Sequence, residues 1–517
     1  MELSSLLLLV PVLLAGYFYL TEVRAAGRNT RRLPVPPSPR GLPLIGNLRQ
    51  VGALPHRALR ALAAAHGASD LMGLRLGQVP ALVASSPSAA AAIMREHDGA
   101  FATRPYFRTA EILTYGFQDL VFAPHGEHWR HARRICSAHV LSAARSNGHH
   151  GTREREVAAM VRAIRESSAA SEVVDVSKAL YGFANAVICR AVSGTGRNSS
   201  WEEEEAAGKK RSELFRELIE ENTALLGGFC VGDYFPSLAW ADALSGAGAR
   251  AWRNFRRWDE LLEKVVQEHE ARRRGDGDSE EEDFVDVLLT LQAAERQDDG
   301  FELTRDAIKS LLADMFAAGT ETTFIALEWA MSELVRNPST MHKLQRELRR
   351  SSDTGASASA TTPYLQAVVK ETLRLHPPVP LLLPRECMRD VTVMNFHVAK
   401  GTRVFVNAWA VGRDPASWSA PEEFRPERFL EEEREVDFRG AHFKFVPFGA
   451  GRRVCPGMQF GLATVELALA SLVRMFDWEI PGGAAPEELD MSDAPGLTTP
   501  RRVPLRLVAK PFSCEEQ

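Results

Sequence analysis

The stretch FGAGRRVCPG at residues 448–457 decides how this chain folds and what its chemistry is. It surrounds a single cysteine, Cys455, with three glycines, which permit tight turns of the backbone. A cysteine is kept as a reactive thiolate by backbone N–H groups and a nearby cation, and Arg453 supplies such a charge. Phe448 is placed to cover the sulfur and exclude water. The alternative is a buried structural cysteine beside a glycine-rich turn, and the motifs described next weigh against it.

A long apolar segment from Thr304 to Arg336 predicts a central, buried helix. Its apolar and small residues recur near every 3.6 positions, and Asn337-Pro338 ends it because the residue before proline avoids helical dihedrals. The motif AGTETT at residues 318–323 combines small residues, which let a flat ligand approach, with a threonine that can bond back to a carbonyl. An alcohol that orders water, backed by a carboxylate, is a suitable proton relay. The alternative is a threonine-rich core helix whose glutamate faces water.

Two further patterns pair charges or aromatic rings at fixed spacings. Glu371 and Arg374 are three residues apart and therefore share one helix face, while PERF at residues 426–429 supplies another arginine. Trp129 and Arg133 share a face of a different predicted helix. Arginine forks suit carboxylates, although a surface salt bridge is the alternative at each of these positions.

In their order along the chain, the motifs resemble those of the cytochrome P450 superfamily, which are WxxxR, (A/G)Gx(D/E)T(T/S), ExxR, PERF and FxxGxRxCxG. The resemblance covers essentially the whole chain. It implies a mostly α fold, a single large helix-rich domain with a small β-rich region, and haem b (iron protoporphyrin IX) as cofactor. The roles that it implies are catalytic for Glu321 and Thr322, haem binding for Trp129, Arg133, Arg385, Phe448, Arg453 and Cys455, iron ligation for Cys455, and a structural cluster of Glu371, Arg374 and Arg428.

The same resemblance implies a monooxygenase that inserts one atom of O₂ into a small lipophilic substrate. Electrons would come from NADPH through a separate NADPH-cytochrome reductase, because the chain has no convincing flavin or nicotinamide site. LHPP at 375–378, VNAWA at 406–410 and GRDP at 412–415 resemble plant A-type microsomal members, and LLGGF at 225–229 with DYFP at 233–236 resembles grass enzymes that hydroxylate indole-type benzoxazinoid precursors.

Other functions stay open at this point. Terpenoid or oxime oxidation would use the same chemistry. An O₂-independent haem isomerase or dehydratase would not need the Glu321–Thr322 pair, and a non-catalytic haem carrier would bind haem without forming product. The segment from Ser351 to Thr362 is shorter and less acidic than is usual in the family, which bears on reductase coupling.

The N-terminus predicts a membrane anchor. Leu3 to Leu20 is apolar apart from two serines, about the length of a membrane helix. Arginines follow it, which places the body of the protein in the cytosol. A cleaved signal peptide is the alternative, but the basic segment that should precede its apolar core is absent. We expect an anchor over 1–23, a basic and proline-rich hinge over 24–41, a catalytic domain over 42–517, and a single-pass location in the endoplasmic reticulum membrane.

Composition excludes other classes. The 517 residues carry a net charge of −5, with no basic excess that would suit nucleic acid. The six cysteines lie far apart without CxxC or zinc spacing, as expected of reduced thiols. Strands are predicted at Leu71–Leu76 and Ala81–Ala84, and loops at Arg272–Asp283, exposed and mobile, and at Ser351–Thr362.

Overall fold

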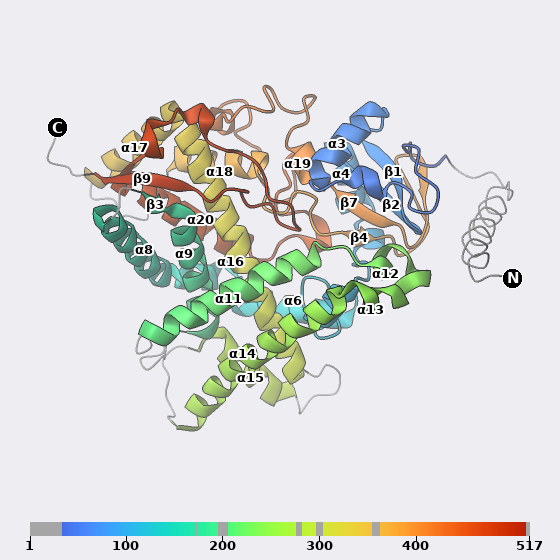
Figure 1. The fold of residues 1–517 in the computed structure, drawn as a ribbon, viewed down its shortest axis with the longest axis horizontal. Helices are drawn as coiled ribbons and strands as arrows, with labels where there is room; N and C mark the ends of the chain where they lie inside the picture. The colour runs from blue at the N-terminus through green and yellow to red at the C-terminus, as the bar shows by residue number, and fades with distance from the viewer. Residues whose placement is uncertain are drawn as a thin grey trace, which may run out of the picture.

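The computed structural model describes residues 34–170, 173–194, 205–275, 282–295, 303–353 and 362–512. Helices dominate and surround the long helix α16, while β1, β2, β4 and β7 gather at one side of the molecule (Figure 1). The predicted mostly α fold with a small β-rich region is confirmed. The α-helices are α2 (Leu48–Val51), α3 (Pro55–Ala65), α4 (Pro87–Ala91), α5 (Arg108–Leu113), α6 (Glu127–His139), α7 (Ala143–Gly148), α8 (His150–Ala170), α9 (Val176–Ser193), α11 (Glu205–Leu226), α12 (Val231–Tyr234), α13 (Asp242–Ser245), α14 (Ala247–Gly275), α15 (Phe284–Glu295), α16 (Arg305–Arg336), α17 (Pro338–Asp353), α18 (Pro363–Leu375), α19 (Ala408–Val411) and α20 (Met458–Met475).

In the described part of the chain, the strands form three small sheets. In the largest the order is β1-β2-β7-β4, with β1 antiparallel to β2 in the register Leu71↔Ala84 and β2 parallel to β7. Both predicted strands are confirmed, the second beginning two residues earlier, at Val79. The strands are β1 (Leu71–Leu76), β2 (Val79–Ala84), β3 (Val174–Asp175), β4 (Arg385–Glu386), β5 (Val391–Val393), β6 (Phe396–Val398), β7 (Arg403–Val406), β8 (Phe476–Glu479) and β9 (Arg506–Pro511).

Short irregular turns link these elements. The turn η1 is a π-helix and the others are 3₁₀-helices. Two of them flank the residues of the candidate site: η4 carries the PERF motif and η5 precedes Cys455. They are η1 (Ala92–Glu96), η2 (Asp98–Phe101), η3 (Pro236–Ala241), η4 (Pro426–Phe429), η5 (Gly451–Arg453), η6 (Pro481–Gly483) and η7 (Pro486–Glu488).

Helix α16 is the axis of the fold. Thr304 caps it by accepting the N–H of Ala307, and Asn337 ends it, so the predicted helix is confirmed within one residue. Its 32 residues extend for roughly 50 Å. It packs against α9, α14, α18 and α20, and most of its side chains are buried, as a helix that is apolar on most sides must be.

The cysteine loop joins two hydrophobic cores. One core is built mainly from the long helices, and the other from the large sheet and the segment of α4, η1 and η2. Val446 and Ala450 pack into the sheet core, whereas Phe448 packs against the helical core. Residues 448–457 are therefore anchored on both sides.

The two loop predictions had mixed outcomes. Arg272 and Arg273 belong to the end of α14, and residues 276–281 lie outside the described part of the chain. The loop prediction is therefore wrong at Arg272 and Arg273. Asp283 lies outside the helices, but the expected exposure is wrong there, because its carboxylate is buried 3.0 Å from His269. Residues 351–353 continue α17, residues 354–361 lie outside the described part, and Thr362 is buried because it caps α18.

The predicted anchor, Leu3–Leu20, lies outside the described residues. Among the residues that are described, α20 is the helix long and apolar enough to cross a membrane, and 56% of it is buried. Its position directly after Cys455, packed against α8, α16 and α17, is that of a core helix. The described end of the hinge lies on the sheet side, where Pro37 accepts the N–H of Gly73 and Pro34 that of His397.

Candidate functional site

Cys455 lies in the turn between η5 and α20. Its backbone N–H donates to the Phe448 carbonyl at 2.9 Å. Gly451 has a φ of +69°, and a Cβ there would lie 2.3 Å from a carbonyl of η1, so only glycine fits. Burial raises the pKa of the Cys455 thiol, while the Gly457 N–H and the charge of Arg133 lower it. The loop thus offers the half-buried sulfur a hydrogen-bond donor and a cation, which a thiolate needs.

Four arginines gather near this loop and are called the arginine group: Arg104, Arg133, Arg385 and Arg453. Arg133 donates to the Val454 carbonyl at 2.8 Å. Burial lowers the pKa of Arg453, and the charges of Arg385 and Arg133 lower it further. The group donates mostly to backbone carbonyls: Arg453 to Ala102 (2.7 Å) and Ala123 (2.6 Å), Arg385 to Ala450 (2.8 Å), and Arg104 to Val121 (3.0 Å), Leu383 (2.9 Å) and Pro384 (3.0 Å).

Positive charge exceeds negative charge in this group. Among the described residues, the carboxylates that act on it are Asp98, which lies 3.3 Å from Arg385, and Asp119. Nη1 of Arg453 is buried and has no hydrogen-bond partner in the described part of the protein. An uncompensated buried cation is costly, and a guanidinium fork suits a carboxylate. The residues therefore fit a cofactor that brings acidic groups, as the two propionates of haem do.

Trp129 packs against two members of the arginine group, Arg453 and Arg133. Its ring centroid is 4.1 Å from the guanidinium carbon of Arg453 and 5.6 Å from that of Arg133. Its indole N–H donates to the Leu120 carbonyl at 3.2 Å. In this structure Trp129 thus covers the arginines with its ring, while its N–H contacts backbone. The ring of Phe448 packs edge-on against Phe438 at 5.4 Å.

The structure places Glu321 and Thr322 on α16 but directs their side chains differently. The Thr322 hydroxyl donates back to the Ala318 carbonyl at 2.7 Å, as its sequence position predicts. The Glu321 carboxylate accepts from Thr223 of α11 at 2.6 Å and from Thr498 at 2.8 Å. Burial raises the pKa of Glu321, and these two hydrogen bonds oppose the shift. The carboxylate thus joins three segments of the chain, and the two side chains make separate hydrogen bonds.

Glu371, Arg374 and Arg428 form one buried cluster, called the Glu371 cluster. Arg374 donates to both carboxylate oxygens at 2.7 and 2.8 Å, and Arg428 donates to one at 3.1 Å. The Arg425 backbone N–H adds a fourth bond at 2.8 Å. All three side chains are fully buried. The remaining guanidinium nitrogens donate to carbonyls of Gly412, Ser419, Ala420, Pro421 and Glu423.

Sequence reasoning missed a pair of buried carboxylates near the arginine group. Asp314, on α16, accepts the N–H groups of Leu120 and Val121 at 2.6 and 3.2 Å. Asp119 accepts the N–H of Phe122, and burial raises its pKa to about 6. Burial and the charge of Asp119 raise the pKa of Asp314. A single charge within the apolar run 311–316 was the available signal. Thr223, Thr498 and Arg104 carried no comparable signal.

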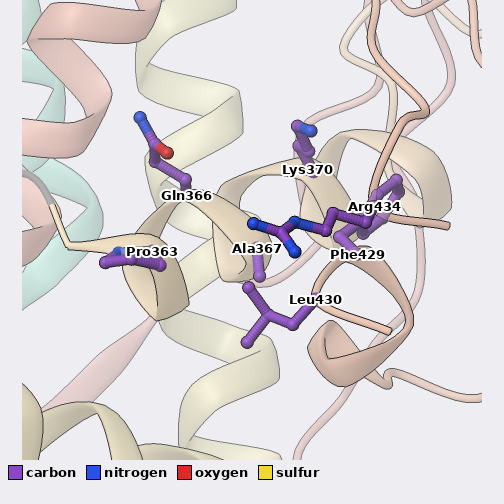
Figure 2. A pocket seen from close by; sticks show the side chains of 7 residues that line it. All are labelled: Pro363, Gln366, Ala367, Lys370, Phe429, Leu430 and Arg434. Atoms are coloured by element: carbon purple, nitrogen blue, oxygen red, sulfur yellow. The ribbon is translucent and has the colours of Figure 1, made fainter. Parts of the chain in front are cut away.

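None of the candidate site residues lines the surface pocket. Figure 2 shows the side chains that line the pocket, which come from α18 and from the segment around η4. The cavity volume is about 180 Å³. It adjoins the Glu371 cluster, because Lys370 precedes Glu371 in the chain. The lining residues are Pro363, Gln366, Ala367, Lys370, Phe429, Leu430 and Arg434. Leu238 and Trp240, on η3, are exposed.

Comparison with known proteins agrees with this geometry. The family model described as cytochrome P450 matches residues 36–504. Cytochrome P450 71A1 of Persea americana is 44% identical, over 90% of this chain and 91% of that protein. An indolin-2-one monooxygenase of Zea mays is 42% identical, over 97% and 95% of the two chains. A phenylacetaldehyde oxime monooxygenase of Prunus mume is 41% identical, over 98% and 95%. The chain therefore belongs to the cytochrome P450 family and is a haem-dependent monooxygenase of the plant type.

Proposed function

We propose that this monooxygenase hydroxylates a small lipophilic plant metabolite of the indole type. The observation that carries the chemistry is Cys455, held in its loop beside an arginine group with excess positive charge. The similarity to the maize indolin-2-one monooxygenase supports the indolic substrate class. The oxime monooxygenase of Prunus mume is nearly as similar, so oxime oxidation is the second candidate, with terpenoid oxidation as a further alternative.

The proposed cofactor is haem b, with Cys455 as the iron ligand. A thiolate-ligated haem activates O₂ when it is reduced. Arg453, Arg385 and Arg133 would hold its propionates, because a buried guanidinium nitrogen of Arg453 still lacks a partner within the described chain. Trp129 would press its ring against these arginines. Phe448 would limit the access of water to the sulfur.

Glu321 and Thr322 are the proposed proton-handling residues. Oxygen insertion consumes two protons, which an acid and an alcohol on one helix can supply. Glu321 would hold a proton more readily than an exposed glutamate, since burial raises its pKa. The Glu371 cluster would act as a scaffold for the segment that leads to the cysteine loop, because its bonds tie α18 to the residues around η4.

The proposed organisation is an anchor over 1–23, a hinge over 24–41 and a catalytic domain over 42–517. We further propose that the protein lies in the endoplasmic reticulum membrane, where it contacts membrane lipid. Its redox partner in this proposal is an NADPH-cytochrome reductase. The reduced similarity of the segment 351–362 to the family pattern makes reductase coupling the step to measure in a reconstituted system.

Substrate-difference spectroscopy on the full-length protein tests the substrate class. The titration would compare indole and indolin-2-one with a phenylacetaldoxime panel and a terpenoid panel. A saturable low-spin to high-spin shift with the indolic compounds alone supports the proposal. A shift with oximes or terpenoids alone overturns the indolic proposal and leaves the monooxygenase chemistry intact.

A second measurement addresses the O₂-independent alternative, an isomerase or dehydratase. Product formation from a compound that gives the spin shift should require both NADPH and O₂. Turnover under argon without NADPH would contradict the oxygen-insertion reaction. Binding without any NADPH-dependent product, in the presence of an active reductase, would instead indicate a haem carrier.

A further inference from the structure

Three buried polar atoms on α9 and α16 have no hydrogen-bond partner among the described residues. They are the hydroxyl of Tyr181, the amide nitrogen of Asn185 and the hydroxyl of Thr320. Their side chains are 7%, 5% and 0% exposed, respectively. Buried polar groups in folded proteins almost always have a partner, and ordered water is the usual one when protein atoms supply none.

The packing of the two helices places these residues at similar levels along α9 and α16. The ring of Tyr181 contacts that of Phe324 at 5.5 Å, and a Cβ at Gly319 would lie 2.8 Å from the Ile188 side chain. The helices therefore run antiparallel in this region, and Asn185 lies between the two contacts on α9. On α16 Thr320 also lies between them. We call Tyr181, Asn185 and Thr320 the polar seam.

Tyr181, at one end of the polar seam, lies beside an exposed charged pair on α11, the helix that also contacts Glu321. On α11, Arg216, Glu220 and Thr223 are spaced at four and three residues and share one face. The Arg216 guanidinium lies 5.2 Å from the ring centroid of Tyr181 and donates to Glu220 at 2.7 Å, and both charged side chains are about half exposed. Thr223, at the other end of this face, donates to Glu321.

We propose that water molecules held in the polar seam carry protons from the exposed Arg216–Glu220 pair to the carboxylate of Glu321. The reaction R–H + O₂ + 2e⁻ + 2H⁺ → R–OH + H₂O consumes two protons in each turnover, while its electrons come from the redox partner. Glu321 would accept these protons from the seam and pass them on through Thr322. Tyr181, Asn185 and Thr320 are positioning residues for water, and the inference rests on the role proposed above for Glu321.

The electrostatics keep Glu321 and Tyr181 able to carry a proton. Burial raises the pKa of Glu321, and the nearby charge of Glu220 raises it further. Burial together with the charges of Glu321 and Glu220 raises the pKa of Tyr181, which therefore stays a neutral phenol that can both donate and accept. Cys189, whose thiol contacts the Asn185 side-chain oxygen at 3.4 Å, leaves the amide nitrogen of Asn185 available for water.

The test compares two substitutions in the polar seam with a matched tyrosine elsewhere. Tyr181→Phe and Asn185→Leu keep the shape of the side chains and remove the polar atoms. Tyr364→Phe is the control, because its phenol donates to Glu427 at 2.8 Å, so this change removes a real bond far from the seam. The measurement is NADPH-dependent O₂ consumption by the full-length holoenzyme with a plant reductase, in H₂O and D₂O, with indole as the probe.

We expect Tyr181→Phe and Asn185→Leu to slow O₂ consumption by about tenfold, less than the ~100-fold typical of losing a direct general acid. The solvent isotope effect should rise in both, and the control should match the wild type. A structure of the holoenzyme should show ordered water within hydrogen-bond distance of Tyr181 and Asn185. Wild-type rates and isotope effects in both variants, or a dry seam in that structure, would overturn the inference.

Glu321→Gln separates this inference from the role of Glu321 itself. If Glu321→Gln slows the reaction and the seam variants do not, the route through the seam is wrong and the role of Glu321 stands. If Glu321→Gln has no effect, both fall. Should Asn185→Leu lose its haem, Tyr181→Phe alone decides, because the Tyr181 hydroxyl makes no bond to the described protein whose loss would unfold it.

Discussion

The Glu371 cluster and the arginine group are both buried and both rich in arginine, yet they differ in how completely they are satisfied. In the Glu371 cluster, one carboxylate receives bonds from two guanidinium groups and one backbone N–H, and neighbouring carbonyls take the remaining donors. In the arginine group, like charges lower one another's pKa and a nitrogen of Arg453 has no partner within the described chain.

We interpret this difference as that between a complete structural unit and a proposed binding site. A buried charge cluster whose donors and acceptors are matched needs nothing else, although breaking it is costly. A group with excess positive charge and an unused donor is stable only when an anion completes it. We therefore propose that the same residue type serves as scaffold at one place and as a cofactor contact at the other. Substitutions should expose this difference directly.

The largest effect is expected in the Glu371 cluster. Glu371→Gln keeps the size of the side chain but leaves the buried charges of Arg374 and Arg428 without a carboxylate. Removing one partner of a buried ion pair costs about 3–5 kcal/mol. We expect little folded holoprotein, measured as haem absorbance recovered per milligram and as the melting temperature of what is recovered. A yield and melting temperature equal to those of the wild type would show that the cluster is dispensable.

The arginine group should respond with loss of haem and not with loss of folded protein. Arg453→Met removes a cation that burial already disfavours. Losing one charged hydrogen bond to a propionate, about 1.5–3 kcal/mol, corresponds to release of haem about 10–100 times faster. Transfer of haem to apomyoglobin measures this rate.

Arg452→Met is the matched control for that measurement. Arg452 is adjacent in sequence, but its side chain is 52% exposed and pairs with Asp98 at 3.2 Å. Its loss should leave haem release close to the wild-type rate. Equal acceleration in both variants would mean that general disturbance of the loop, and not a contact of Arg453 with the cofactor, controls haem retention.

The sequence predicted the residues of the Glu371 cluster better than it predicted their surroundings. The spacing of Glu371 and Arg374 places both on one face of α18, which is local geometry. Arg428 lies 57 residues from Glu371 in sequence, and only the resemblance to a known family paired them. The carbonyls that complete the cluster come from a loop whose path depends on tertiary packing, so no periodic pattern could reveal them.

Helix α16 shows the same limit of prediction from sequence: its local features could be predicted, whereas its tertiary partners could not. The length, cap and end of α16 followed from periodicity, Thr304 and Asn337-Pro338. The partners of Glu321 did not, because Thr223 and Thr498 lie in segments that only the fold brings together. Asp283 was expected in an exposed loop because charged neighbours surround it, yet a buried histidine holds it in the interior.

Asp119, a buried carboxylate whose charge acts on the arginine group, should affect stability in a pH-dependent way. Burial raises the pKa of Asp119 to about 6, above its value in the unfolded chain. Its contribution to stability is therefore full below about pH 4 and is lost as the pH rises through about 6. Asp119→Asn keeps an oxygen that can accept from Phe122, so it should match the wild type near pH 4 and be more stable, by about 1–3 kcal/mol, at pH 7.5.

Urea unfolding of the holoprotein at several pH values measures this difference. Haem must be present in both proteins at equal occupancy, because the charge of Arg453 acts on Asp119. A stability difference between Asp119→Asn and wild type that does not change between pH 4 and 7.5 would show that Asp119 does not titrate in this range.

The smallest effect should come from a glutamate at the rim of the Glu371 cluster. Glu422 pairs with Arg413 at 3.0 Å and with Arg60 at 2.7 Å, but its side chain is 58% exposed. Water can replace a carboxylate there, and Arg413 keeps its stacking on the ring of Trp409 at 4.2 Å. Glu422→Gln should therefore lower the free energy of unfolding by less than about 1 kcal/mol, measured beside Glu371→Gln under the same conditions.

The substitution is chemically identical at both sites, so the ratio of the two losses measures what burial adds to an arginine–carboxylate pair. Comparable losses would mean that the pairing itself, and not its complete removal from water, stabilises this part of the fold.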